Sequence, residues 1–293
     1  MMTPSNIAIF GEVLFDCFPT GEKVLGGAPF NIAWHLQAMG DSPTFISRVG
    51  TDDLGKQIIL SAQEWGLKPD HIQLDPTHPT GQVAITVEEG EPHYLITPDS
   101  AYDFIDQHLI KLPSPPDILY HGTLALRNKP SRQALEALIQ TTGAPLFLDV
   151  NLRDPWWQKD DVEQWLSRAT WVKLNIDELK TLGFATNHTE SEMRQFQNQF
   201  DLEQVIVTRG SEGPIVLTQD NQFHEKKPDD LAKFVDTVGA GDAFTAVYIH
   251  GLMSKWSIEK TLAAAQGFAS QVIGIRGATS TDPAFYQQFI DTL

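Results

Sequence analysis

The sequence predicts an α/β protein with a mostly parallel central sheet flanked by helices. Short apolar segments typical of buried strands alternate with longer segments of helical periodicity through most of the 293 residues. Strands that alternate with helices usually form a parallel sheet that is covered on both faces. Neither an internal repeat nor a linker-like composition interrupts the series, so we expect a single domain over 1–293.

The first part of the chain begins this alternation and then changes its rhythm. We expect a strand at 7–19, a glycine turn and helix at 25–40, a strand at 44–50 and a helix at 53–66. At 81–97, apolar and polar residues alternate on both sides of the turn EEGEP, which predicts a β-hairpin. Because this hairpin interrupts the series, we expect it to form a small lid.

The alternation then resumes and continues to the C-terminus. The predicted strands are 118–123, 145–151, 171–175 and 204–210, and the predicted helices are 131–141, 161–170, 176–183 and 191–200. A second hairpin is expected at 215–227, followed by helices at 239–253, 257–275 and 282–291. Ligands of such sheets bind outside the carboxyl ends of the strands, so the residues that end these strands are of most interest.

Composition and charge exclude several classes of function. The net charge of −17 argues against nucleic acid, because basic patches supply most of that affinity. It does not exclude ATP, because Mg²⁺ and backbone N–H groups neutralise phosphates locally. The single cysteine, Cys17, allows no internal disulfide, which suits a reducing cytoplasm. No signal-peptide pattern or membrane-length apolar run is present, so we expect a cytoplasmic protein without a membrane partner.

The run DTVGAGDAF at 236–244 is the most informative part of the sequence. The small residues Gly239, Ala240 and Gly241 let backbone N–H groups approach an anion, and the helix predicted after them adds a positive dipole end. Asp242 stands beside this cradle. The alternative is a plain helix start with an acid that complements the dipole. A cradle for a transferring phosphate and a carboxylate that accepts a hydroxyl proton together indicate phosphoryl transfer to an alcohol.

Further polar residues and glycines stand where predicted strands end and helices begin. They are Asp16, Gly26, Gly27, Asn31, Asp149, Asn151, Arg153, Asn175, Glu178, Thr208, Arg209 and Gly210. Any one of them can be a helix cap, and Asn175 and Glu178 have the spacing of a capping box. On spacing alone, capping explains that pair better than binding of a metal through water. The whole set, however, is expected to converge on one crevice.

These segments together resemble the ribokinase-like (PfkB) carbohydrate kinase family over nearly the whole chain. LGGAPFNIAWHLQAMG is similar to the family's N-terminal glycine signature, and VDTVGAGDAFTAV is similar to its C-terminal signature. LNIDEL resembles its Asn-x-x-Glu element, and VTRGSEG resembles its nucleotide-side loop. GGAPFN and DVNLRDPWW resemble the fructokinase branch. The resemblance implies a ribokinase-like fold with a β lid over the sugar, contributed by about 12–27 and 80–98.

The resemblance also implies roles for individual residues. Asp242 would be the base, and the backbone of Gly239, Ala240, Gly241 and Asp242 the anion hole. The residues that would bind the sugar are Asp16, Gly26, Gly27, Asn31 and Arg153. Those that would border ATP are Asn175, Thr208, Gly210, Gly213, Gln266 and Ser270. Asn175 and Glu178 would hold Mg²⁺ through water, and Asp236 and Val238, with the backbone near Ile275 and Gly277, are candidates for a K⁺ site.

The sequence leaves the acceptor open. The leading hypothesis is an ATP-dependent fructokinase, and the alternatives are kinases for 2-keto-3-deoxygluconate, ribose or a nucleoside. Phe30 and Pro214 depart from the family's commoner residues, which alters pocket size without removing a catalytic group. A non-catalytic sugar sensor is disfavoured because it needs no proton acceptor, and a dehydrogenase because no GxGxxG follows the first strand. The lid hairpin has an edge that can pair with a second copy, so a homodimer stays open.

Overall fold

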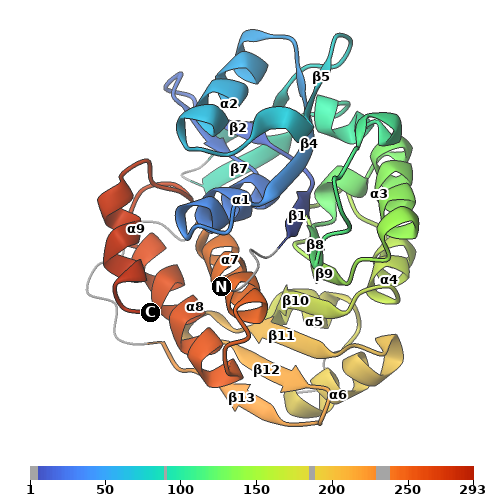
Figure 1. Ribbon diagram of the computed structural model, residues 1–293, viewed down its shortest axis with the longest axis vertical. Coiled ribbons are helices and arrows are strands. Elements are labelled where there is room, and N and C mark those ends of the chain that lie inside the picture. The colour runs from blue at the N-terminus through green and yellow to red at the C-terminus, as the bar shows by residue number, and fades with distance from the viewer. Residues whose placement is uncertain (1–5, 89–90, 185–188, 229–237) are drawn as a thin grey trace.

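The computed structural model describes residues 6–88, 91–184, 189–228 and 238–293. Within them, the main sheet has nine strands in the order β13-β12-β11-β10-β9-β8-β1-β4-β5 (Figure 1). Their bounds are β1 (Ile7–Phe10), β4 (Thr44–Gly50), β5 (Ile72–Asp75), β8 (Ile118–His121), β9 (Leu146–Asp149), β10 (Trp171–Asn175), β11 (Gln204–Thr208), β12 (Ile215–Thr218) and β13 (Phe223–Glu225). The strands from β5 to β11 pair in parallel, and β12 and β13 form the antiparallel edge. The predicted α/β class is confirmed.

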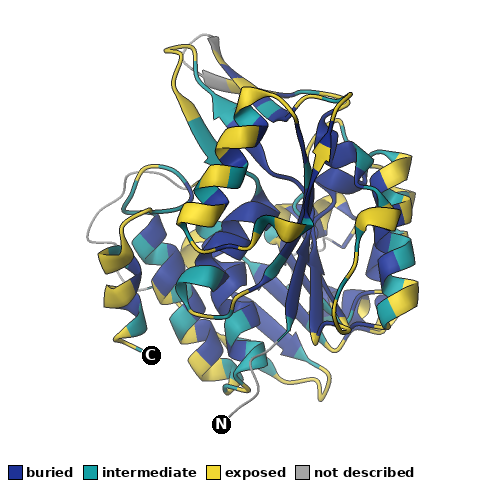
Figure 2. Ribbon diagram, turned by 45° about the horizontal axis from the view of Figure 1, so that its top comes forward, coloured by how far each residue is buried: buried dark blue, intermediate teal, exposed yellow. Residues whose placement is uncertain are grey.

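Helices cover both faces of this sheet (Figure 1). One layer consists of α1 (Ala28–Ala38), α2 (Asp53–Glu64), α7 (Ala240–Met253), α8 (Ile258–Val272) and α9 (Pro283–Ile290). The other consists of α3 (Lys129–Thr142), α4 (Lys159–Leu166), α5 (Ile176–Thr181) and α6 (Thr189–Phe200). Successive side chains of a strand point to opposite faces, so Ile7 and Ile9 join the first core, whereas Ala8 and Phe10 join the second. Figure 2 shows the buried strands between these helical layers.

A second sheet of four strands extends beyond the main one, in the order β3-β2-β6-β7. Its strands are β2 (Leu14–Cys17), β3 (Lys23–Gly26), β6 (Gly81–Glu88) and β7 (Glu91–Ile96). The hairpin predicted at 81–97 is therefore correct, and β2 and β3 join it. The prediction of one strand over 7–19 was wrong. The chain leaves the main sheet at Gly11, whose φ is 151° and where an added Cβ would lie 2.5 Å from Cγ of Pro29.

The two sheets are connected by a crossing of backbone segments that only glycine permits. Gly27 has a φ of 107°, and a Cβ there would lie 2.8 Å from the carbonyl oxygen of Glu12. A Cβ at Gly81 would lie 3.0 Å from the carbonyl oxygen of Val13. Because the backbones touch without intervening side chains, the second sheet starts directly at the carboxyl end of β1. In the described part of the chain, no helix combines the length and the apolar character that spanning a membrane requires.

Buried histidine gives this fold a testable dependence on pH. His35 in α1 is fully buried, with its Nδ1 3.1 Å from the hydroxyl of Tyr286. Burial lowers the pKa of His35 to about 3. The unfolded chain takes up a proton below about pH 6.5, whereas the folded protein does not, so stability falls as the pH drops from about 6.5 toward 3. The loss is about 1.4 kcal/mol per pH unit for one such group.

We therefore expect His35→Gln to reduce the slope of the free energy of unfolding against pH in this interval. Urea unfolding at several pH values measures that slope. His108→Gln is the matched control, because His108 is exposed and should leave the slope as it is. Equal slopes for the wild type and His35→Gln would contradict the assignment.

Candidate active site

The site is built around the N-terminus of α7. Gly239 is the residue before the helix and has a φ of 78° and a ψ of −5°, a left-handed conformation that glycine adopts without strain. A Cβ at this position would collide with Ala278. Because the chain turns here, Ala240, Gly241 and Asp242 form the first turn of α7. The first N–H groups of a helix have no carbonyl one turn earlier to bind, so this turn presents donors and a positive dipole end to an anion.

Asp242 is held in place by α1. Nδ2 of Asn31 donates a hydrogen bond of 2.8 Å to Oδ2 of Asp242, although the two residues are 211 positions apart in sequence. Burial raises the pKa of Asp242 above its usual value, and the hydrogen bond from Asn31 opposes that rise. A carboxylate with a raised pKa is a stronger base. The arrangement therefore gives an oriented proton acceptor beside an anion cradle.

A buried ion pair lies under the same turn. Nζ of Lys173 donates to both carboxylate oxygens of Asp149, at 3.1 Å and 3.0 Å. The two residues are direct partners in the register of β9 and β10. A Cβ added to Gly241 would lie 3.3 Å from Nζ of Lys173, so the cation sits against the cradle. Thr245 completes the network, since its Oγ1 lies 3.2 Å from Oδ2 of Asp149 and 2.9 Å from the carbonyl oxygen of Gly241.

The sequence did not indicate Lys173 or Thr245 as site residues, and it indicated Asp149 only as one of the polar residues that end the predicted strands. The available signal was position: Lys173 lies two residues before Asn175 on β10, so both side chains leave the strand on the same face. From the sequence alone, a lysine within an apolar strand indicates a position at the solvent-exposed edge of a sheet. Only the pairing of β9 with β10 shows that this lysine has a buried carboxylate as its partner.

Two further acids, Glu12 and Asp16, share with Asp242 the influence of one cation. Asp16 on β2 has its Oδ2 3.5 Å from where a Cβ of Gly26 would stand, and burial raises its pKa to about 6. Glu12 is only 3% exposed, and burial raises its pKa to about 7. The exposed Arg153 lowers the pKa values of Glu12, Asp16 and Asp242, so its charge reaches all three carboxyl groups. The charge of Arg153, a predicted sugar-binding residue, thus acts both on Asp16, another such residue, and on Asp242, the predicted base. Sequence reasoning missed Glu12.

The predicted nucleotide residues lie along the adjacent strand ends. Asn175 and Thr208 are register partners at the ends of β10 and β11. Gly210 and Gly213 follow in the next loop, with φ values of 55° and 80°. The remaining predicted pair is on α8, where Nε2 of Gln266 donates to Oγ of Ser270 at 3.2 Å.

Asn175 and Glu178 form the capping box that their spacing predicts. Oδ1 of Asn175 accepts from the backbone N–H of Glu178 at 2.8 Å, and Oε2 of Glu178 accepts from the backbone N–H of Asn175 at 2.8 Å. Oε1 of Glu178 accepts from the backbone N–H of Leu152, also at 2.8 Å. A carboxylate oxygen has two lone pairs, so each can still bind a water molecule. The described residues contain no group of three or more His, Cys, Asp or Glu side chains that could hold a metal ion by themselves.

The predicted potassium site is only partly described. Asp236 lies outside the described residues, whereas Val238 is 45% exposed directly before Gly239. Ile275 and Gly277 lie in the segment after α8, and a Cβ at Gly277 would be 3.6 Å from Cγ1 of Val24 on β3. The potassium site therefore stays a prediction.

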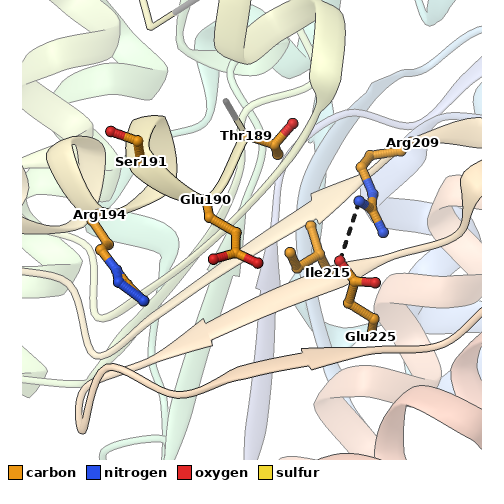
Figure 3. A pocket seen from close by; sticks show the side chains of 7 residues that line it. All are labelled: Thr189, Glu190, Ser191, Arg194, Arg209, Ile215 and Glu225. Atoms are coloured by element: carbon orange, nitrogen blue, oxygen red, sulfur yellow. Dashed lines mark ion pairs between the residues drawn. The ribbon is translucent and has the colours of Figure 1, made fainter. Parts of the chain in front are cut away.

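A surface cavity of about 580 Å³ lies beside the nucleotide-side loop (Figure 3). Its lining residues are Thr189, Glu190, Ser191, Arg194, Arg209, Ile215 and Glu225. Arg209 and Glu225 form an ion pair of 3.3 Å across it. Asp242 is not part of this lining, and the two arginines are balanced by two glutamates. This cavity therefore gives no reason to move the predicted base away from the N-terminus of α7.

Comparison with known proteins places this geometry in a family. The model of the pfkB family of carbohydrate kinases matches residues 8–284. The chain is 26% identical over 302 residues to a fructokinase from Salmonella typhimurium, covering 95% of this chain and 96% of that protein. It is also 26% identical over 263 residues to the aminoimidazole riboside kinase of Salmonella typhimurium strain LT2, covering 83% and 80%.

Among solved structures, the chain is similar to fructokinase from Vibrio cholerae O395 with fructose, ADP and calcium bound. The TM-score is 0.82 at 25% sequence identity, with 97% of this chain and 98% of that chain covered. The ribokinase-like arrangement of the main sheet and its helices is thus shown over almost the whole length.

The capping box allows a test of local stability at the site. Asn175→Ala removes the acceptor for two N–H groups of α5, those of Asp177 and Glu178, and should lower the free energy of unfolding by about 1 kcal/mol. Urea unfolding measures this change. Asn198→Ala is the control, because Asn198 is exposed within α6 and its replacement should cost nothing. Equal stability of Asn175→Ala and the wild type would refute the cap.

Proposed function

The chain belongs to the pfkB family of carbohydrate kinases, and we propose that the sugar it phosphorylates is fructose. ATP-dependent phosphorylation of a sugar follows from the family and from the fructokinase relatives. Fructose is supported by the number of relatives named fructokinase and by the similar structure that contains fructose and ADP. The observation on which the proposed mechanism rests is Asp242, held by Asn31 at the start of α7.

In the proposed reaction, the sugar lies under the second sheet and its hydroxyl faces Asp242. Asp242 accepts the hydroxyl proton while the oxygen attacks the γ-phosphorus of ATP in line. The N–H groups of Gly241 and its neighbours in the first turn of α7 stabilise the charge on the transferring phosphoryl group. Residues of about 12–27 and 80–98 serve as the lid, which excludes water that would otherwise accept the phosphoryl group.

ATP occupies the carboxyl ends of β10 and β11 in this proposal. Thr208, Gly210 and Gly213 border the nucleotide on one side, with Gln266 and Ser270 on the other. Asn175 and Glu178 fit a magnesium ion that keeps several waters, since such ions need only one or two carboxylates beside the substrate phosphates. When bound, Mg²⁺ would neutralise phosphate charge.

A nucleoside acceptor is the second candidate, because the aminoimidazole riboside kinase of Salmonella is as similar in sequence as the fructokinases. A panel of fructose, ribose, 2-keto-3-deoxygluconate and aminoimidazole riboside, assayed by ADP release, decides between the candidates. The highest kcat/KM with fructose supports the proposal. A kcat/KM at least tenfold higher with another acceptor overturns it.

Asp242→Asn tests the base directly. The amide keeps the shape of the side chain but cannot take a proton, so kcat should fall by about a hundredfold or more. Asp160→Asn is the control, because Asp160 is exposed in α4 and should leave kcat unchanged. Circular dichroism and thermal melting show whether both variants are folded. A folded Asp242→Asn protein with near-normal kcat would remove Asp242 from its role.

The raised pKa of Asp16 predicts how sugar affinity depends on pH. Burial raises this pKa to about 6, so the carboxylate that accepts hydroxyl hydrogen bonds is present above pH 6 and is lost below it. The KM for the sugar should therefore rise as the pH falls from 7.5 to 5.5. Asp16→Asn should raise KM about tenfold or more at pH 7.5 and reduce this pH dependence. If the ratio of KM at pH 5.5 to KM at pH 7.5 were the same in Asp16→Asn as in the wild type, the assignment would be contradicted.

A further inference from the structure

The ion pair under the cradle has no role in the mechanism described so far. Lys173 and Asp149 are buried, with side chains that are 9% and 1% exposed. Burial of two charges costs several kcal/mol, and a well-packed apolar pair is often as stable. Their placement is specific, however. Nζ of Lys173 lies against Gly241. The single hydroxyl hydrogen of Thr245 is shared between two acceptors, Oδ2 of Asp149 at 3.2 Å and the carbonyl oxygen of Gly241 at 2.9 Å.

We propose that the Lys173–Asp149 pair consists of positioning residues, which anchor the first turn of α7 and set the proton affinity of Asp242. This inference rests on the proposed function of Asp242 as the base. The anchoring runs from Asp149 through Thr245 to the carbonyl oxygen of Gly241, one residue before Asp242. The electrostatic effect comes from one charge of each sign held next to that residue.

The two charges act on Asp242 in opposite directions. Burial is the largest cause of the raised pKa of Asp242; the negative charge of Asp149 raises it further, and the positive charge of Lys173 lowers it. Burial alone would lower the pKa of Lys173, but Asp149 and Glu178 outweigh it and keep the lysine charged. The effects of the two charges on the pKa of Asp242 therefore oppose each other. When either residue is replaced, the charge of the other acts on Asp242 unopposed.

Other groups also face Asp242, and replacing Lys173 or Asp149 leaves these groups in place. Asn31 from α1 donates to it, and Arg153 from the loop after β9 lowers its pKa. Glu12, which follows β1, interacts with Asp242 by like charge. Tyr120 on β8 feels the charge of Asp242, but burial raises the pKa of Tyr120 well above 10, so it stays neutral.

The test measures the protonation of Asp242 in four proteins: wild type, Lys173→Gln, Asp149→Asn and the double variant. Aspartate labelled with ¹³C at the side-chain carboxyl is titrated by NMR, and the resonance of Asp242 is assigned by its loss in Asp242→Asn. The acid limb of kcat/KM against pH is recorded in parallel. Thr245→Val is the matched control, because it removes the hydroxyl link and keeps both charges.

Lys173→Gln should move the Asp242 titration and the acid limb upward by about one pH unit or more, because the repulsion by Asp149 is then unopposed. Asp149→Asn should move both downward by a similar amount. The double variant should lie close to the wild type, and Thr245→Val should leave the titration in place while lowering kcat. Opposite shifts support the proposal. Shifts in the same direction, or none in a folded single variant, overturn it.

Each single variant decides the question by the sign of its shift, so the failure of one to fold leaves the other as the test. The outcome is also separable from the proposed function. If the wild type phosphorylates no sugar in the panel, the proposed function fails, while the NMR titration of Asp242 still tests the electrostatic part. If the wild type is an active kinase and the shifts do not have opposite signs, only the present inference fails.

Discussion

The hydrogen bond between Asn31 and Asp242 is the interaction on which the site depends. It joins α1 from the beginning of the chain to α7 near its end, and it orients the only acid in the first turn of α7. Each helix can start where it does because a glycine precedes it. Gly27 brings α1 against the backbone of Glu12, and Gly239 turns the chain into α7. Without both turns, the amide and the carboxylate would not lie within hydrogen-bonding distance.

Removal from water makes the acids of this site better proton acceptors than exposed carboxylates. Burial raises the pKa values of Glu12, Asp16 and Asp242, and the charges of Arg153 and Lys173 keep the rise at Asp242 limited. The site combines carboxyl groups that are easily protonated with a helix end that attracts anions. Such a combination suits a reaction in which a proton leaves a hydroxyl as negative charge develops on a phosphoryl group.

One pair shows how a local role and a site role coexist. Asn175 and Glu178 satisfy backbone donors at the start of α5, which is sufficient reason for their spacing. The same bonds fix the two side chains at the carboxyl end of β10, next to Thr208 on β11. Side chains that are held in place by capping a helix are also held in place for binding a ligand. Capping and ligand binding are therefore compatible roles for the same two residues.

The sequence by itself determined the alternation of strands and helices, the hairpin at 81–97 and the glycine turn that begins α7. These features depend on periodicity, glycine and helix-start residues, which act over a few positions. It also indicated Asp242 as a base from the run around it, and Asn31 as a sugar-binding residue through the family resemblance. Only the tertiary structure decided that the first apolar segment divides between two sheets at Gly11, that Glu12 is buried and that Lys173 has Asp149 as its partner. Those features depend on close backbone approach and on desolvation between segments far apart in the chain, which no local pattern encodes.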